Sequence, residues 1–247
     1  MYQNIFSLKN KFALITGGTG GLGFEIAQAF SEMGAAVAIT GRNFNDEHKK
    51  FLCINADILN EDEILNLSGV IKNNFGTLNI LVNCAGKNIL KPAEDYDSEN
   101  FNDVMNLNIN ALHNVTRIIG KNFFIPNKYG KILNLSSVKS FIGTDKNYIA
   151  YCASKGALNM YTRQLACEWG KYNINVNAIA PTFVRTNINA FQLDDPEFKN
   201  KLISRIPLNR IGQKSDIACS AVFLCSDAAS FITGQILFVD GGLTSMQ

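Results

Sequence analysis

The stretch "TGGTGGLG", residues Thr16 to Gly23, stands between a short apolar run at 12–16 and an amphipathic run at 22–33. A short apolar run that ends in glycines is typical of a buried strand turning sharply into a helix. Glycines in such a turn let backbone N–H groups approach a pyrophosphate at the helix N-terminus, where the helix dipole favours negative charge. The stretch therefore predicts a dinucleotide site, and a purely structural turn is the alternative interpretation.

Short apolar runs alternate with longer amphipathic runs along the rest of the chain. The expected strands are 12–16, 36–40, 51–55, 78–83, 131–136, 175–180 and 236–239, and the expected helices are 22–33, 61–75, 99–123, 152–171 and 215–226, the last with Ser215 as N-cap. This alternation predicts an α/β fold: a single-domain, Rossmann-type, doubly wound parallel sheet of about seven strands with helices on both faces. We expect this domain to span 1–247 and the irregular stretch 181–214 to form a substrate-binding lid within it.

Composition narrows the class of protein. Hydrophobic residues make up 47% of the 247 residues, which is too apolar for a disordered chain, and the net charge of +2 argues against a nucleic-acid surface. No apolar run approaches the ~20 residues of a membrane span, and the N-terminus lacks a secretory pattern. The six cysteines show no C-x-x-C spacing and the two histidines lie far apart. We therefore expect reduced thiols, no metal site and a cytoplasmic protein without a membrane partner.

The end of the second expected strand bears on the choice of cofactor. Many dinucleotide folds place an acidic residue there to hold the ribose 2′-hydroxyl, but this chain has Gly41 and Arg42. A guanidinium pairs with a 2′-phosphate, so NADP(H) is favoured and NAD(H) is the alternative, with Arg42 then only stacking on adenine. Asp57, after the third strand, either accepts from the adenine amino group or caps the helix at 61–75. Because 16 positions separate Gly41 from Asp57, the second crossover has little room for a full helix.

Four motifs stand in one order along the chain. They are T-G-x-x-x-G-x-G, on Gly17, Gly21 and Gly23; "NCAG", Asn83 to Gly86; "NLSS", ending at Ser137; and "YCASK", Tyr151 to Lys155. Together they resemble the short-chain dehydrogenase/reductase family, and the resemblance extends to "VDGG" at Val239 to Gly242.

The resemblance implies a role for each matching residue. Tyr151 would be the catalytic acid/base, Lys155 would hold the nicotinamide ribose, Ser137 would hydrogen-bond the substrate carbonyl, and Asn108 would complete a proton relay. The cofactor would contact the turn, the strand ends and the segment after the sixth strand, at Gly17, Thr19, Gly21, Leu22, Gly23, Arg42, Asp57, Ile58, Asn83, Ala85, Gly86, Tyr151, Lys155, Pro181, Val184 and Thr186. Two features depart from the family. Thr182 follows Pro181 where glycine is usual, and Ser137 lies 14 positions before Tyr151, so Ser136 is the alternative.

Electrostatics predicts the direction of the tyrosine pKa. At an effective dielectric of about 20, an ammonium roughly 6 Å away contributes on the order of 2.8 kcal/mol, or about two pKa units. Lys155 is therefore expected to lower the pKa of Tyr151 from about 10, and the positive ring of oxidised nicotinamide adds in the same direction. Together they are expected to bring the phenol toward neutrality, where proton transfer is efficient.

The sequence indicates the substrate less clearly than it indicates the cofactor. Several stretches resemble family members that act on sugar acids and polyols, such as gluconate 5-dehydrogenase and 2-dehydro-3-deoxy-gluconate 5-dehydrogenase. Ser137 and Tyr151 would contact the reacting carbonyl or alcohol of a small-molecule substrate, and Arg185, Asn187 and Asn189 of the lid would bind its carboxylate and hydroxyls. A solvated loop is the competing interpretation of these three.

Two other functions stay open. A 3-oxoacyl-(acyl carrier protein) reductase shares the four motifs and would need a basic face, for which Lys121, Lys128 and Lys131 are candidates. A non-catalytic NADP(H)-sensing protein would not need both Tyr151 and Lys155. By resemblance we also expect a homotetramer built through 99–123, 152–171 and the C-terminal strand.

Overall fold

The computed structural model describes residues 2–185 and 193–246. Seven parallel strands form one sheet in the order β3-β2-β1-β4-β5-β6-β7. Their bounds are β1 Phe12–Thr16, β2 Ala36–Gly41, β3 Leu52–Asn55, β4 Ile80–Asn83, β5 Gly130–Leu135, β6 Ile174–Pro181 and β7 Ile236–Val239. The order runs outward from β1 in one direction and from β4 in the other, so the carboxyl ends of these two strands form a switch point, where doubly wound sheets bind ligands.

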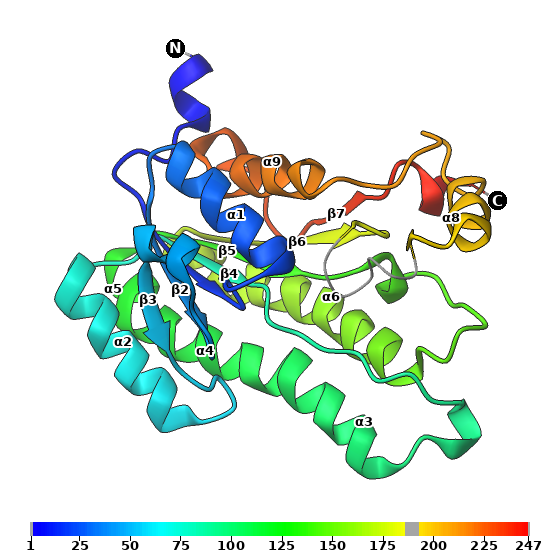
Figure 1. The fold of residues 1–247 in the computed structure, drawn as a ribbon. Helices are drawn as coiled ribbons and strands as arrows, with labels where there is room; N and C mark the ends of the chain where they lie inside the picture. Colours follow the sequence, from blue (N-terminus) through cyan, green and yellow to red (C-terminus); the bar gives the residue numbers. More distant parts are fainter. Residues whose placement is uncertain (1, 186–192, 247) are drawn as a thin grey trace.

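Helices cover both faces of the sheet (Figure 1). On one face α1 (Gly21–Glu32) packs against α9 (Lys214–Cys225) over an apolar core that includes Ile26 and Phe30. On the other face α2 (Glu61–Phe75), α4 (Leu112–Ile119) and α6 (Ile149–Trp169) cover a second core. The predicted α/β fold is confirmed.

The remaining described elements are short. They are η1 Tyr2–Phe6, η2 Asp46–Lys50, η3 Ala93–Asp95, α3 Ser98–Met105, η4 Asn106–Ala111, η5 Gly120–Phe124, α5 Ile125–Asn127, η6 Val138–Ser140, η7 Gly170–Tyr172, α8 Pro196–Ile203, η8 Asp227–Ala229 and η9 Leu243–Ser245. The second crossover is the single 3₁₀ helix η2, which confirms the expected lack of room. None of the described helices is both long enough and apolar enough to cross a membrane.

The helical pattern over 99–123 is present but divided. Two π-helical turns, η4 and η5, interrupt α3, α4 and α5. Such turns are often found at functional sites, and η4 contains Asn108. The helix expected at 152–171 begins earlier, at Ile149, so Tyr151 already lies in its first turn.

The expected N-cap Ser215 is wrong, and so is the helix cap that was one of two roles left open for Asp57. The last long helix begins at Lys214, and the Asp216 carboxylate accepts a hydrogen bond from the Gln213 N–H, so Ser215 lies inside the helix. For α2 the cap is Asn60, whose side-chain oxygen accepts from the N–H groups of the first turn. Asp57 instead accepts from the N–H of Leu59 and closes a local turn before the helix.

Candidate active site

The glycine-rich turn brings the ends of β1 and β4 into contact. Gly17 has φ +65°, and a Cβ there would lie 2.9 Å from the backbone of Ala85. The hydroxyl of Thr16 accepts from the N–H groups of Cys84 and Ala85 at 3.2 and 3.4 Å, which joins the two strand ends. Gly21 also has a positive φ, +56°. A side chain at Gly17 would separate the two loops, so glycine is required by packing as well as by conformation.

The turn leaves the start of α1 accessible. Gly20 is the N-cap and supplies no side-chain hydrogen bond, and the first turn of α1 carries no acidic side chain. The helix therefore begins with unsatisfied N–H groups, a site that suits a phosphate. Leu22, in the first turn of α1, is partly buried and packs against the apolar core of this face. These features fit the pyrophosphate of a dinucleotide.

Two of the residues predicted to contact the adenosine part of the cofactor, Arg42 and Asp57, are exposed. Arg42 is exposed and forms no hydrogen bond or ion pair within residues 2–185 and 193–246, so its guanidinium is available to a ligand. The Asp57 carboxylate is also exposed, whereas Ile58 is a core residue with 8% exposure. The Ile58 side chain packs in the core that α2 covers, and a contact of this residue with the cofactor stays a prediction.

Asn83, at the end of β4, belongs to a buried polar chain beneath the site. Its side-chain N–H groups donate to the Thr116 hydroxyl at 3.0 Å and to the Asn134 oxygen at 2.9 Å. Asn134 in turn donates to Thr162 on α6. These hydrogen bonds link two strands of the sheet to α4 and α6 on one of its faces, and the Asn83 oxygen has no hydrogen-bond partner among the described residues.

Helix α6 places Tyr151 and Lys155 one turn apart. The Lys155 ammonium nitrogen lies 5.6 Å from the centre of the Tyr151 ring and donates to the Leu135 carbonyl at 2.7 Å. A side-chain hydrogen bond joins Ser137 to Tyr151. The expected group of three is thus assembled at the carboxyl end of β5.

Ser136, the residue before Ser137, directs its hydroxyl into the protein. The Ser136 hydroxyl donates to the Asn159 side chain at 2.6 Å, inside the protein. The geometry therefore selects Ser137 over Ser136.

The predicted direction of the Tyr151 pKa is wrong for the protein without a cofactor. Burial raises the pKa of Tyr151 to about 12, and the hydrogen bond from Ser137 opposes this only in part. Burial also lowers the pKa of Lys155 to about 8. Burial disfavours the charged form of each group, and the spacing of the two residues in the sequence does not show how deeply they are buried.

Asn108 is held rigidly next to this group. Its amide donates to the Lys87 carbonyl at 3.0 Å and to the Ser154 hydroxyl at 2.9 Å, and its oxygen accepts from the Lys87 N–H. A Cβ on Gly86 would lie 3.2 Å from the Asn108 oxygen and 3.7 Å from the Lys155 nitrogen. Ser154 was not predicted, although it lies inside "YCASK"; the Lys87 backbone left no signal in the sequence.

The residues predicted to contact the substrate and the nicotinamide follow β6, and the structure describes some of them. Arg185 forms an ion pair with Asp194 at 2.6 Å. Pro181 is buried at the end of β6, and Val184 pairs with Gly212 in an isolated bridge. The Thr182 hydroxyl is buried with no hydrogen-bond partner in the described part of the chain. Thr186, Asn187 and Asn189 lie outside the described residues.

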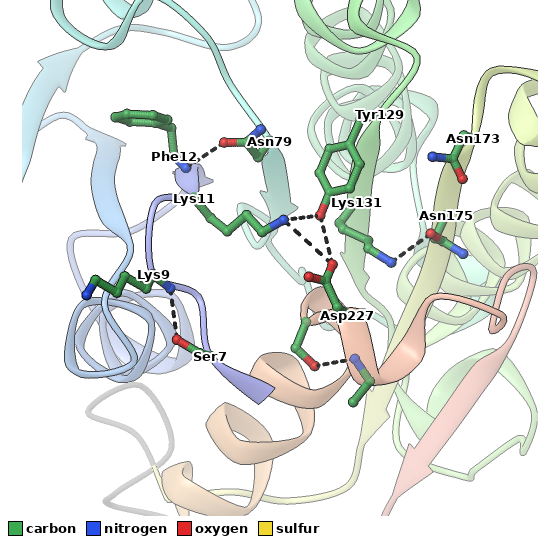
Figure 2. Close-up of polar contacts among 12 residues, drawn as sticks. Ser7, Lys9, Lys11, Phe12, Asn79, Tyr129, Lys131, Asn173, Asn175 and Asp227 are labelled. Atoms are coloured by element: carbon green, nitrogen blue, oxygen red, sulfur yellow. Dashed lines mark hydrogen bonds and ion pairs between the residues drawn. The ribbon is translucent and has the colours of Figure 1, made fainter. Parts of the chain in front are cut away.

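Of the three lysines considered for a carrier-protein face, Lys121 and Lys128 are exposed as expected, but Lys131 is not. Lys131 lies at the amino end of β5, opposite Ser137, and is 3% exposed. Figure 2 shows Lys131 directed toward Asn175, to which it donates at 2.8 Å, with Tyr129 and Asp227 nearby. Burial lowers the pKa of Lys131. Its assignment to an exposed docking face is therefore wrong.

Comparisons with known proteins agree with this geometry. The site combines a glycine-rich turn, a helix start without a side-chain cap, and the group of Ser137, Tyr151 and Lys155. At the switch point of a doubly wound sheet, this combination is typical of nucleotide-dependent oxidoreductases. Residues 17–244 match the family model described as enoyl-(acyl carrier protein) reductase. The chain belongs to the short-chain dehydrogenase/reductase family and is an oxidoreductase.

Individual relatives are similar over nearly the whole chain. The gluconate 5-dehydrogenase of Gluconobacter oxydans (strain 621H) is 33% identical, with 98% of each chain covered. The NAD-dependent glycerol dehydrogenase of Listeria innocua is 38% identical, covering 98% of this chain and 97% of that protein. A gluconate 5-dehydrogenase structure from Burkholderia cenocepacia J2315, in complex with NADP and tartrate, superposes with a TM-score of 0.92 at 32% identity over 100% of both chains.

Proposed function

We propose that this protein is an NADP(H)-dependent oxidoreductase that transfers a hydride between nicotinamide and a carbonyl or secondary alcohol of a sugar acid, keto-sugar or polyol. The observation that carries the proposal is the group formed by Ser137, Tyr151 and Lys155, which lies beside an uncapped helix start. A phenol that stays protonated at neutral pH is ready to donate a proton to a developing alkoxide.

The proposed mechanism assigns one task to each side chain. When bound, the cofactor supplies the hydride. The Ser137 hydroxyl orients the substrate oxygen, and Tyr151 gives that oxygen its proton in the reductive direction. Lys155, held by the Leu135 carbonyl, places positive charge near the phenolate that remains. Asn108 fixes the backbone of Lys87 next to this group, so the proton path keeps its geometry.

The preference for NADP(H) rests on Arg42. Its exposed guanidinium lacks a partner among the described residues, and no acidic side chain takes the position that would repel a 2′-phosphate. The Burkholderia relative contains NADP, which supports the proposal. The Listeria relative is named NAD-dependent, so NAD(H) is the alternative.

The sugar-acid or polyol substrate rests on the relatives and on the lid. Two of the three relatives described above are gluconate 5-dehydrogenases, and the Burkholderia structure holds tartrate, a hydroxy acid. We propose that 181–214, within one domain spanning 1–247, closes over the substrate. Arg185 would exchange its exposed ion pair with Asp194 for the substrate carboxylate, an exchange that costs little because surface ion pairs are weak.

A 3-oxoacyl-(acyl carrier protein) reductase remains the second candidate, because the matched family model is described by an acyl carrier protein reductase. The position of Lys131 argues against it. A non-catalytic NADP(H) sensor is a weaker third candidate, because the chain keeps both Tyr151 and Lys155 in contact.

We also propose a cytoplasmic homotetramer. The six cysteines are unpaired, which suits a reducing compartment. Large apolar side chains are exposed on the elements expected to form interfaces, such as Met160 on α6 and Leu237 on the edge strand β7. Light scattering in solution tests the stoichiometry: four copies support the proposal and a monomer refutes it.

Turnover with a substrate panel tests the function. Purified protein is mixed with gluconate, other sugar acids, polyols and a short 3-oxoacyl thioester, each with NADP(H) and NAD(H). Faster turnover of sugar acids or polyols with NADP(H) is expected. Preference for the thioester would select the second candidate, and cofactor binding without turnover would select the sensor.

A further inference from the structure

His48 is a buried side chain between the two loops that lie nearest the proposed phosphate contacts. It belongs to η2 and is 4% exposed. Its Nδ1 accepts from the backbone N–H of Asn45 at 2.8 Å, and its Nε2 lies 3.2 Å from the carbonyl oxygen of Thr19. Asn45 ends the segment after β2 that carries Arg42, and Thr19 lies in the glycine-rich turn. One imidazole therefore connects both loops.

The two hydrogen bonds fix the state of the ring. A backbone N–H can only donate, so Nδ1 must be unprotonated. Nε2 then carries the hydrogen and donates to the Thr19 carbonyl. The side chain is a neutral imidazole of one tautomer, and neither nitrogen is left for a ligand. His48 can act on a cofactor only through the backbones that it joins.

Aromatic packing keeps the ring in this orientation. Phe24 on α1 meets it edge to face with ring centres 5.0 Å apart, and Phe44 does so at 5.9 Å. The Cys53 thiol donates to the His48 carbonyl at 3.2 Å. Rotation of the imidazole would displace these neighbours, so the link between the loops is rigid.

The segment that carries Arg42 is held at both ends. At its start, Gly41 packs so closely on Thr19 that a Cβ would lie 2.2 Å from the Thr19 methyl carbon. At its end, Asn45 is held by His48. Phe44, inside the segment, also packs on the His48 ring. Arg42 has no side-chain hydrogen bond or ion pair in the described structure, so the backbone of this segment sets where its side chain begins.

We propose that His48 is a positioning residue for cofactor selectivity: by joining Asn45 to Thr19 it holds the Arg42 segment where a ribose 2′-phosphate binds. The proposal rests on the proposed use of NADP(H). Loss of the link would leave the pyrophosphate contacts of the turn in place, but it would let Arg42 move away from the 2′-phosphate. The affinity for NADP(H) would then fall, whereas the affinity for NAD(H) would stay the same.

Dissociation constants for NADP⁺ and NAD⁺ test this, measured by calorimetry on wild type and variants. His48→Phe keeps an aromatic ring between Phe24 and Phe44 but removes both hydrogen bonds. We expect the NADP⁺ dissociation constant to rise about five- to tenfold and that of NAD⁺ to change less than twofold. His48→Asn and His48→Gln, which can restore one bond each, should fall between. His113→Phe is the matched control at the other, exposed histidine, and should leave both constants unchanged.

A double variant separates positioning from general stability. If His48 acts through Arg42, His48→Phe should have no further effect on the NADP⁺ constant in an Arg42→Ala background. Equal losses for NADP⁺ and NAD⁺, or additive losses in the double variant, would overturn the inference. Failure of the cofactor proposal looks different: wild type would bind both dinucleotides equally, or Arg42→Ala would keep the preference.

Discussion

Gly23 lies against Gly17 so closely that a Cβ at position 23 would stand 2.3 Å from the Gly17 carbonyl oxygen. Helix α1 can approach β1 at this distance only because the position has no side chain. The contact sets where the uncapped helix start stands relative to the turn.

Gly23→Ala is therefore expected to destabilise the protein by about 1–3 kcal/mol, the usual cost of overpacking, and to weaken dinucleotide binding. Urea unfolding and NADP⁺ titration measure the two effects. Gly69→Ala is the matched control, because Gly69 is an exposed position in α2 with no atom within 4 Å of its Cβ. That variant should gain about 0.5–1 kcal/mol and bind normally. Normal binding by Gly23→Ala would show that the turn does not hold the cofactor.

The lowered pKa of Lys155 predicts how stability depends on pH. Its pKa is about 8 in the folded protein and 10.5 as the reference, so between these values the unfolded chain binds a proton that the folded protein has lost. Stability must then rise with pH in this window, by up to about 1.36 kcal/mol per unit. Above about 9 the buried thiols of Cys84 and Cys225, whose pKa burial raises to about 12, act in the opposite direction.

We expect urea unfolding of the cofactor-free protein to show increasing stability from pH 8 to pH 9, and Lys155→Met to show a smaller increase. Lys131 and Lys139, whose pKa values burial also lowers, contribute equally to both proteins and cancel in the comparison. Identical slopes would mean that Lys155 is charged and solvated in the folded state.

The raised pKa of Tyr151 predicts a spectroscopic result. The difference in tyrosinate absorbance between wild type and Tyr151→Phe should appear only above pH 10 in the free protein, because burial raises the pKa to about 12. Bound NADP⁺ should shift this difference to lower pH, since its positive ring favours the phenolate. A titration near neutrality without cofactor would contradict the structure and restore the expectation from sequence.

Two adjacent serines form a matched pair for the substrate contact. Ser137→Ala should lower kcat by about 10²–10³, the scale measured when one hydrogen-bond donor to a developing oxyanion is removed. Ser136→Ala removes only the internal bond to Asn159 and should reduce stability while keeping kcat. The reverse pattern would mean that the register assigned to this loop is wrong.

The fold could be predicted from the sequence because its signals are local. Apolar runs such as 12–16 and 236–239 became strands, and Gly17 and Gly23 of the turn stand where a Cβ would collide. The short spacing between Gly41 and Asp57 also foretold a crossover without a full helix. Helix caps were less predictable. The N-caps are Asn60 and Gln213, and not Asp57 and Ser215, because the backbone geometry at each helix start decides the cap and the sequence does not show it.

The sequence predicted which residues form the site, but not how deeply they are buried. Tyr151, Lys155 and Ser137 come together as expected, yet the pKa of the phenol moves in the opposite direction because burial depends on packing by distant segments. The role of His48 likewise needs contacts with Thr19 and Phe24, residues more than twenty positions away. No spacing rule links these residues.

The most direct test is the turnover of Tyr151→Phe with the best substrate of the panel, together with its NADP⁺ dissociation constant. The variant loses one hydroxyl and keeps the ring against Lys155. We expect turnover to fall by about 10²–10⁴, the contribution of a general acid, while NADP⁺ binding changes little. Turnover close to that of wild type would mean that the Tyr151 hydroxyl does not move the proton.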